Sequence, residues 1–175
     1  MKRFLLFILV GLAILGCTKK VIEEERVIKV EKRDKISNEI WKIPIKLKDM
    51  EYKNIETKLI TTEGDFKEFI AKLKQKKDWK SRKNFLDILN NAKINFKDEN
   101  FLFYSFREDK GYIISAVNPP IQNDSNVTIK IDKELASPHL KGEFNHYGLA
   151  YRVKKVVKNI IFINDKSRKV IKNGN

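Results

Sequence analysis

Apolar and polar residues alternate strictly over residues 41–47, a pattern typical of a strand with one buried face. The apolar positions are Trp41, Ile43, Ile45 and Leu47. Pro44 lies between them and has no backbone N–H to donate, so we expect this strand at a sheet edge or with its proline on the unpaired side. We expect the folded domain to begin near Trp41, and a second short strand over residues 57–61.

Two later segments carry apolar residues at the spacing of an amphipathic helix. Thr62 begins the first, and Asp65 follows three residues on, as in a capping box. Ser81 precedes the second, which we expect to end near Asn90 and Asn91. The apolar stripes are Phe66, Phe69, Ile70 and Leu73 in the first helix and Phe85, Ile88, Leu89 and Ala92 in the second.

The rest of the chain indicates β-structure. Residues 101–106 are apolar or aromatic at consecutive positions, as in a central strand. Residues 108–111 predict a hairpin turn, and residues 133–148, with their proline and glycines, predict an irregular connection. Further strands are expected over residues 112–117, 127–132, 149–157, 160–163 and 170–171. This order predicts an α+β fold, with an antiparallel sheet of about five to six strands and two helices packed on one face.

The first 17 residues have the pattern of a secretory leader. Two basic residues precede an apolar run over residues 4–15, which is shorter than the about 20 residues of a membrane-spanning helix. Residues 14–17 end in Cys17, the one cysteine of the chain, and resemble the lipobox of bacterial lipoproteins. The resemblance implies cleavage before Cys17, diacylglycerol on its sulfur and an acyl chain such as palmitate on its nitrogen. An uncleaved anchor or an ordinary signal peptide with a chance cysteine are the alternatives.

The leader divides the chain into three expected parts and indicates where in the cell the protein is located. Residues 1–16 are the expected lipoprotein signal peptide, residues 17–40 a lipidated charged tether, and residues 41–175 a single α+β domain. Acyl chains on Cys17 would hold the mature protein on a bilayer essentially permanently. We therefore expect a cell-envelope protein. Thr18 stands where enterobacterial-type lipoproteins retained at the inner membrane carry aspartate, which favours the periplasmic face of the outer membrane.

The net charge of the chain, taken together with the expected location, limits the classes of partner. Without the two basic leader residues, the chain has 35 basic against 23 acidic residues, a net charge of +12. Export from the cytosol removes nucleic acid as an expected partner, and leaves anionic lipids, polysaccharides and acidic proteins. Basic residues are densest over residues 72–83, around Trp79. The cluster consists of Lys72, Lys74, Lys76, Lys77, Lys80, Arg82 and Lys83.

This basic segment has two interpretations. It could be an anionic docking face in which Trp79 is the aromatic anchor. Alternatively, it could be a solvated link between the two helices with Trp79 in the core. This second interpretation is favoured because runs of surface charge are usually only solvated.

No motif in the chain carries a recognisable reaction. His139 and His146 are seven residues apart without the ligand spacing of a zinc site. None of the seven serines lies in a Gly-x-Ser-x-Gly elbow, and there is no glycine-rich phosphate loop. The sequence predicts no catalytic residue, metal or cofactor. A small envelope hydrolase that uses residues 133–148 remains the alternative from a different class.

A spaced pattern also runs from the first helix to the last strands. Its parts are Phe66 and Phe69 leading to Trp79, Ile94-Asn95-Phe96 before an apolar strand, Lys110-Gly111-Tyr112, and Tyr151-Arg152-Val153. Over about residues 60–163 it resembles the C-terminal domain of PrcB-type protease-complex subunits, in which a Gly-Gly-Tyr stands at the third of these places. The resemblance implies a non-catalytic partner or assembly subunit of an envelope complex.

We therefore predict a membrane-anchored lipoprotein that binds another envelope protein without catalysis. A lipoprotein that binds anionic lipid or polysaccharide through residues 72–83 is a further alternative. Exposed apolar residues on a sheet face or a free strand edge would favour the protein partner. A concentrated basic patch would favour the anionic ligand, and a cleft with converging histidine, glutamate and serine would favour the hydrolase.

Overall fold

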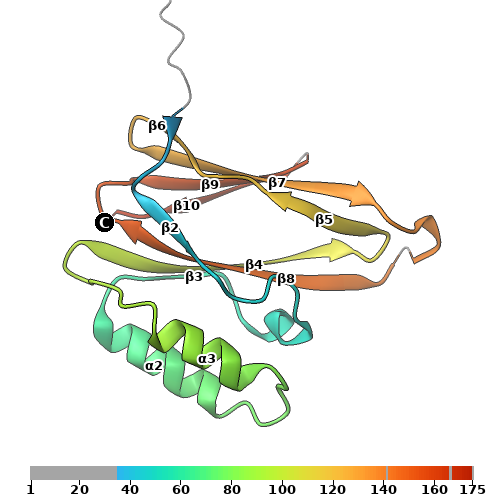
Figure 1. Cartoon of the computed structure of the whole chain (residues 1–175), viewed down its shortest axis with the longest axis horizontal. Coiled ribbons are helices and arrows are strands. Elements are labelled where there is room, and N and C mark those ends of the chain that lie inside the picture. Colours follow the sequence, from blue (N-terminus) through green and yellow to red (C-terminus); the bar gives the residue numbers. More distant parts are fainter. Residues whose placement is uncertain (1–34, 141, 166, 175) are drawn as a thin grey trace, which may run out of the picture. The chain divides into compact units, whose positions relative to one another are not determined.

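Two β-sheets and a pair of α-helices make up the part of the chain that the computed structural model describes, residues 35–140, 142–165 and 167–174 (Figure 1). Cys17 and the leader lie outside these described residues. The elements in chain order are β1 (Lys35–Ile36), β2 (Ile40–Ile43), the 3₁₀ helix η1 (Met50–Asn54), β3 (Lys58–Ile60), α2 (Glu63–Lys74), α3 (Arg82–Asn90), β4 (Glu99–Asp109), β5 (Tyr112–Val117), β6 (Ile121–Asn123), β7 (Asn126–Leu135), the 3₁₀ helix η2 (Pro138–Leu140), β8 (Phe144–Lys154), β9 (Asn159–Asn164) and β10 (Ser167–Lys172).

The strands form two sheets where the sequence predicts one. The four-stranded sheet has the order β2-β8-β4-β3, and its neighbours are antiparallel. The six-stranded sheet runs β1-β6-β7-β9-β10, with β5 also paired to β7, and its β7–β9 pair is parallel. The prediction of one antiparallel sheet is therefore wrong, whereas the predicted α+β class with two helices is confirmed.

The chain changes sheets at residues 108–111, where the sequence predicts a hairpin. β4 ends at Asp109, and β5 then pairs with β7 instead of returning along β4. The Asp109 side chain accepts a hydrogen bond from the Gly111 N–H at 2.7 Å. A Cβ on Gly111 would lie 2.9 Å from the Ser137 carbonyl oxygen, so glycine allows the two segments to approach. A turn that leads from one sheet to another uses the same residue types as a hairpin turn. The sequence pattern of residues 108–111 therefore did not distinguish the two.

The longest ladder joins β4 to β8 and has both faces buried. Its register runs from Glu99 opposite Lys154 to Asp109 opposite Phe144. Successive side chains of a strand point to opposite faces. The central strand predicted for residues 101–106 is confirmed, because β4 lies between β8 and β3.

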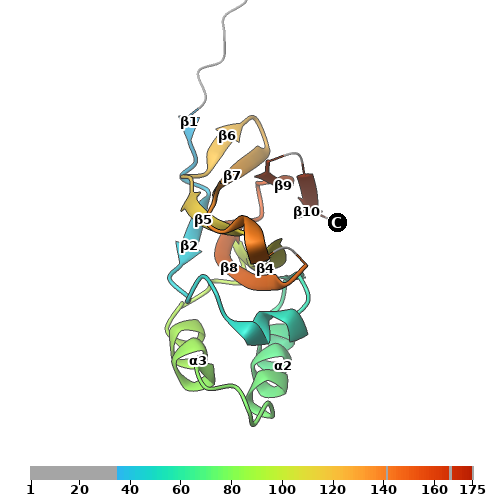
Figure 2. The same cartoon turned by 90° about the vertical axis from the view of Figure 1, so that its right-hand side faces the viewer.

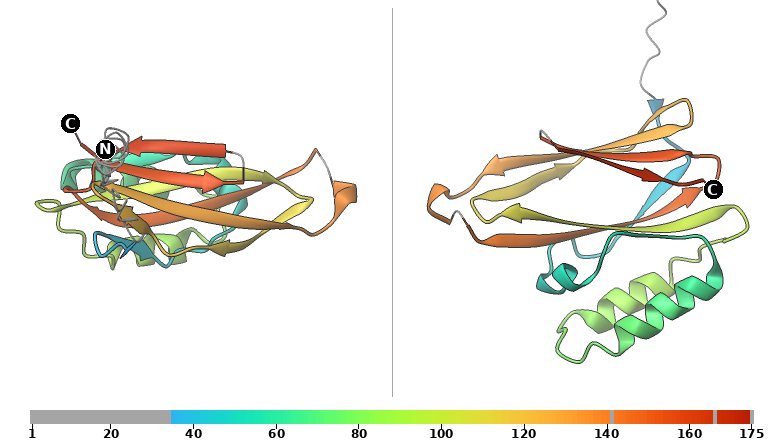
Figure 3. Two further views of the ribbon diagram at one scale, coloured as in Figure 1. Left: turned by 90° about the horizontal axis from the view of Figure 1, so that it is seen from above. Right: turned by 180° about the vertical axis from the view of Figure 1, so that it is seen from behind.

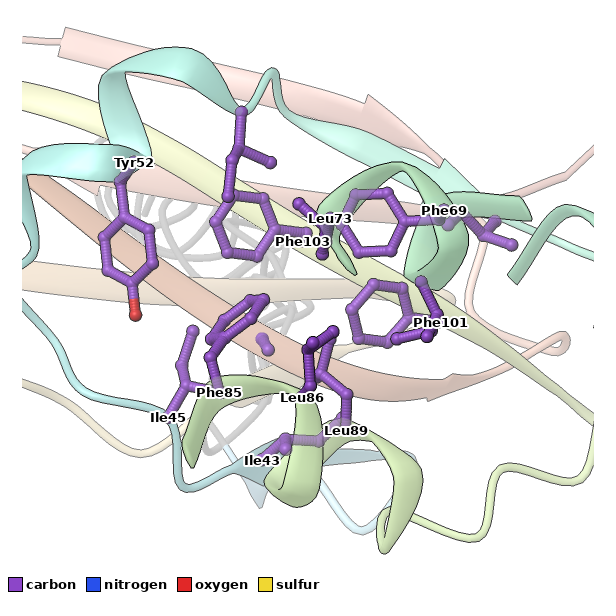
Figure 4. Close-up of a cluster of buried hydrophobic side chains, with 14 of the residues drawn as sticks. Ile43, Ile45, Tyr52, Phe69, Leu73, Phe85, Leu86, Leu89, Phe101 and Phe103 are labelled. Carbon is purple, nitrogen blue, oxygen red and sulfur yellow. The ribbon is translucent and has the colours of Figure 1, made fainter. Parts of the chain in front are cut away.

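One face of this ladder packs against the helices (Figure 4). Phe101 and Phe103 share a buried cluster with side chains from α2, α3 and η1. The ring centroids of Tyr52 and Phe103 are 5.6 Å apart. The helical members of the cluster are Phe69, Ile70 and Leu73 from α2 and Phe85, Leu86 and Leu89 from α3.

Both predicted helices are confirmed. The Thr62 side chain accepts a hydrogen bond from the Asp65 N–H at 3.1 Å, which caps the start of α2. Ser81 stands at the start of α3 but makes no side-chain capping bond there. Phe66 and Ile88 complete the predicted stripes as partly buried residues.

The other face of the ladder packs against the six-stranded sheet (Figures 2 and 3). Leu102 and Tyr104 of β4 meet the inner face of β7 and β9 in a second buried cluster. The rings of Tyr104 and Phe162 stack with their centroids 3.8 Å apart. The members from the six-stranded sheet are Val127, Ile129 and Ile131 from β7 and Ile160 and Phe162 from β9.

The described domain begins before the boundary expected at Trp41. Lys35 and Ile36 pair with β6, and Ser37 and Ile40 are buried, so residues 35–40 belong to the fold and not to a tether. The strand expected over residues 41–47 is shorter in the structure, whereas its expected edge position is confirmed. β2 is the outermost strand of its sheet and ends at Ile43, directly before Pro44.

The irregular connection expected over residues 133–148 is shorter in the structure. β7 continues to Leu135 and β8 begins at Phe144, so only the residues between them, including η2, connect the two strands. Gly148 lies inside β8 because the close approach of a neighbouring ring requires a residue without a side chain there.

We predict that Gly148→Ala lowers the free energy of unfolding by about 1–3 kcal/mol, the usual result of overpacking a core. The new Cβ would lie 2.7 Å from the Tyr52 ring. Gly64→Ala is the matched control, because its Cβ would meet nothing closer than 3.9 Å and Gly64 lies in α2. It should leave the stability unchanged or raise it by up to about 1 kcal/mol. Urea unfolding of both variants measures this, and equal effects would contradict the packing argument.

Candidate functional site

The basic segment at residues 72–83 is largely part of the scaffold. Trp79 is 4% exposed and belongs to the helix-side core, and its Nε1–H donates to the Ser81 hydroxyl at 3.1 Å. The Arg82 guanidinium donates to the carbonyl oxygens of Lys74 and Lys76 near the end of α2. Trp79 therefore lies in the core, as the favoured interpretation of this segment has it, and is not an exposed anchor.

Several lysines of the segment already have partners within the domain. Lys72 pairs with Glu68 at 2.6 Å, and Lys83 pairs with Asp87 at 3.4 Å, each one helical turn away. Lys76 Nζ donates to the Asn54 carbonyl oxygen at 3.4 Å. The remaining members, Lys74, Lys77 and Lys80, are exposed on α2 and on the link to α3.

Ser81 joins Trp79 to Asp49 in a polar chain beneath a hollow of about 620 Å³. The Ser81 hydroxyl donates to Asp49 Oδ2, and the Glu51 N–H donates to Asp49 Oδ1 at 3.0 Å. Burial by itself would raise the pKa of the Asp49 carboxyl, but hydrogen bonds from Ser81, the Glu51 N–H and Trp79, with the charge of Lys46, lower it overall.

This polar chain does not have the properties of a hydrolase site. A general base is most effective when its pKa lies near the working pH, and the lowered pKa of Asp49 makes it a weak base. The Ser81 hydroxyl already donates to Asp49 and accepts from Trp79. The arrangement instead fixes the start of η1 against the link between the two helices.

The segment considered for hydrolysis does not converge into a described cleft. Glu143 pairs with Lys110, and His139 is exposed in η2. His146 lies in β8 opposite Arg107, and burial, with the charges of Lys53 and Arg107, lowers the pKa of its imidazole. Across the described ranges there is no group of three or more histidine, cysteine, aspartate or glutamate residues that could hold a metal.

The outer face of the six-stranded sheet carries a row of side chains that are all apolar except one threonine. The buried residues Val127 and Ile129 point inward, so Thr128 between them points outward. Residues paired directly across neighbouring strands lie on the same face. The register places Ile36 opposite Ile121, Ile121 opposite Thr128, Thr128 opposite Ile161 and Ile161 opposite Val170. We call these five residues, which cross β1, β6, β7, β9 and β10, the outer row.

The outer row is open to solvent at both ends. Ile36 is 59% exposed and Val170 is 45% exposed, whereas Ile161, between Thr128 and Val170, is buried. Beside the row is a hollow of about 470 Å³ whose lining includes Ile36, Pro119, Ile121 and Ile163. Exposed apolar residues on a sheet face, with a hollow beside them, are typical of an interaction site.

Basic side chains border the outer row. Arg168 pairs in register with Ile163, and Lys172 with Asn159, so both point to the same outer side as Val170. Neither makes an ion pair with another described residue. Lys130 is neutralised by Asp132 at 3.1 Å. The border is therefore weakly cationic on the β10 side.

Within residues 35–140, 142–165 and 167–174, no helix has both the length and the apolarity that crossing a bilayer needs. No protein-family model matches the chain, and no curated protein or solved structure matches it either.

Sequence reasoning missed the outer row because its members come from five separate strands. Residues 127–131 alone show a polar outer side, with Thr128 and Lys130, and Ile36 stands in a segment read as a tether. The exposed apolar residues become neighbours only through the strand register. In β10, Val170 is two residues from both Arg168 and Lys172, so an apolar residue shares one face of the strand with two basic residues. This is the one local signal that could have indicated the outer row.

We predict that Asp49→Asn lowers the free energy of unfolding at neutral pH by about 1–2 kcal/mol, because it removes a charge-assisted hydrogen-bond acceptor. Since the folded state holds the pKa of Asp49 below its unfolded value, Asp49 stabilises the fold above that value and loses this effect as the pH falls. The wild type should therefore lose more stability than the variant between neutral and acid pH. Denaturant unfolding across this pH range measures the difference, and parallel pH profiles would contradict the assignment.

Proposed function

We propose that the protein is a lipid-anchored envelope lipoprotein whose domain binds another envelope protein and holds it near a membrane. The outer row is the observation that carries this proposal. An exposed apolar sheet face favours a protein partner over a hydrolase or an anionic polymer. The dispersed and partly neutralised lysines of residues 72–83 give less support to the polysaccharide alternative.

The partner's surface should be apolar in the middle and acidic at one side. Ile36, Ile121 and Val170 offer the apolar contact, and the hollow beside them can receive a side chain. Arg168 and Lys172 would attract carboxylates at the β10 side. Charge complementarity of this kind sets orientation and the rate of encounter more than affinity.

The anchor and the outer row are close in the sequence. Ile36, the first member of the row, follows the described start of the domain at Lys35 by one residue. Residues 18–35 would separate Cys17 from Ile36, a span of up to about 60 Å when extended. A tethered domain would thus meet a membrane protein at a high effective concentration. The resemblance to PrcB-type subunits supports the same non-catalytic role in a complex.

Cys17→Ser should release the protein from membranes, because it removes the sulfur that carries the lipid. The measurement is the distribution between pelleted membranes and supernatant after cell fractionation, together with incorporation of labelled palmitate. Thr18→Ser is the control, since it keeps the cysteine and should sediment like the wild type. A Cys17→Ser protein that still pellets and carries palmitate would contradict lipidation at this residue.

Val170→Glu should weaken partner binding by roughly tenfold or more, because it places a charge in the apolar row and repels an acidic partner. The assay is crosslinking in native membranes, followed by quantification of the crosslinked partner. Val156→Glu is the matched control: Val156 is 66% exposed, outside the six-stranded sheet. A partner lost equally from both variants, or retained by both, would place the binding surface elsewhere.

A further inference from the structure

A second hollow, independent of the outer row, lies along the helices. It has a volume of about 390 Å³, and both helices and the segment after α3 line it. Its lining is mostly apolar, with Ile70 and Leu89 buried at its base and Phe66 and Phe96 partly buried. The centroids of these two rings are 5.6 Å apart, which fixes one side of the hollow.

Lysines stand around this apolar lining. Lys67 is neutralised by Glu63 at 2.6 Å, whereas Lys74 and Lys93 make no ion pair with another described residue. Lys93 has a backbone φ of 47°, in the left-handed region that a lysine rarely adopts. Because Lys74 is on α2 and Lys93 follows α3, two segments each bring one unpaired cation to the hollow.

We propose that this hollow binds the acyl chain of a free long-chain fatty acid, with the carboxylate at Lys74 or Lys93. An apolar base with unpaired cations at its rim complements an anionic amphiphile in both shape and charge. The hollow of about 390 Å³ falls within the roughly 300–1,000 Å³ that is usual for small-molecule sites.

The lining favours an acyl chain over a peptide strand. Helix backbones satisfy their N–H and C=O groups internally, so the walls formed by α2 and α3 offer little main-chain pairing to an extended peptide. An acyl chain needs no hydrogen bonds along its length. An anionic bilayer surface is the competing occupant, and the test separates it from a free fatty acid.

The test uses the full lipidated chain in phosphatidylcholine nanodiscs with a myristic acid that carries a photoreactive diazirine. Crosslinked peptides are mapped by mass spectrometry. We expect labelling to concentrate on the residues that line the hollow, and an excess of unlabelled myristate to suppress it. Ala71 is exposed and lines the hollow, so Ala71→Trp should block it and reduce this labelling by about tenfold.

A charge variant tests the carboxylate contact separately. Lys74→Gln with Lys93→Asn should reduce labelling by roughly threefold to tenfold, and asparagine tolerates the backbone at position 93. Lys77→Gln with Lys97→Gln removes two exposed lysines outside the lining and is the matched control. Circular dichroism and urea unfolding verify that each variant keeps the fold.

Three results would overturn the proposal. One is labelling spread over the surface, which indicates adventitious contact with the fatty acid. Another is labelling of the hollow that persists in folded Ala71→Trp. The third is labelling that appears only with a photoreactive phosphatidylglycerol in the nanodisc, which would assign the lysines to a bilayer surface. None of these results bears on the outer row, so the proposed protein partner is tested separately.

Discussion

The pairing of β4 with β8 is the constraint on which the rest of the structure depends. Its continuous register supports two buried faces, one against the helices and one against the second sheet. Phe103 faces the helices opposite Ala150, and Tyr104 faces the other sheet opposite Leu149. A slip of one residue would exchange these faces and send aromatic side chains into the wrong core.

Small residues on the helix side of β8 make this arrangement fit. Gly148 and Ala150 leave space beneath the helices, and the Tyr52 ring occupies the space above Gly148. The large residues on the same face come from β4 and the helices instead. Close packing of a core requires such an alternation of large and small side chains across facing elements.

The outer row and the hollow along the helices both lie on faces that the two cores leave uncovered. The six-stranded sheet uses its inner face for the core, and its outer face keeps the apolar row that the strand register assembles. The helices use one stripe each for the core, and the hollow between them remains apolar because Phe66, Ile94 and Phe96 are only partly covered. Basic side chains border both surfaces: Arg168 and Lys172 lie beside the outer row, and Lys74 and Lys93 line the hollow.

The basic segment shows why composition did not identify these surfaces. Arg82 holds carbonyl oxygens near the end of α2, and Trp79 fills the core and donates to Ser81. Their charge and size suggest docking residues, whereas their contacts hold the two helices together. Of the seven basic residues in the predicted cluster, Lys74 alone lines the hollow between the helices, and its counterpart Lys93 lies outside the cluster.

The sequence by itself determined both helices, the central strand, the edge position of the strand before Pro44 and the inward face of β7. These depend on periodicity, capping and missing N–H groups, which act over a few residues. Only the tertiary structure decided that the strands divide into two sheets, that β7 and β9 run parallel, and that Ile36, Ile121, Ile161 and Val170 meet on one face. The β1–β6 and β7–β9 pairings join segments that are far apart in the chain, and no local pattern records which distant strand lies beside which.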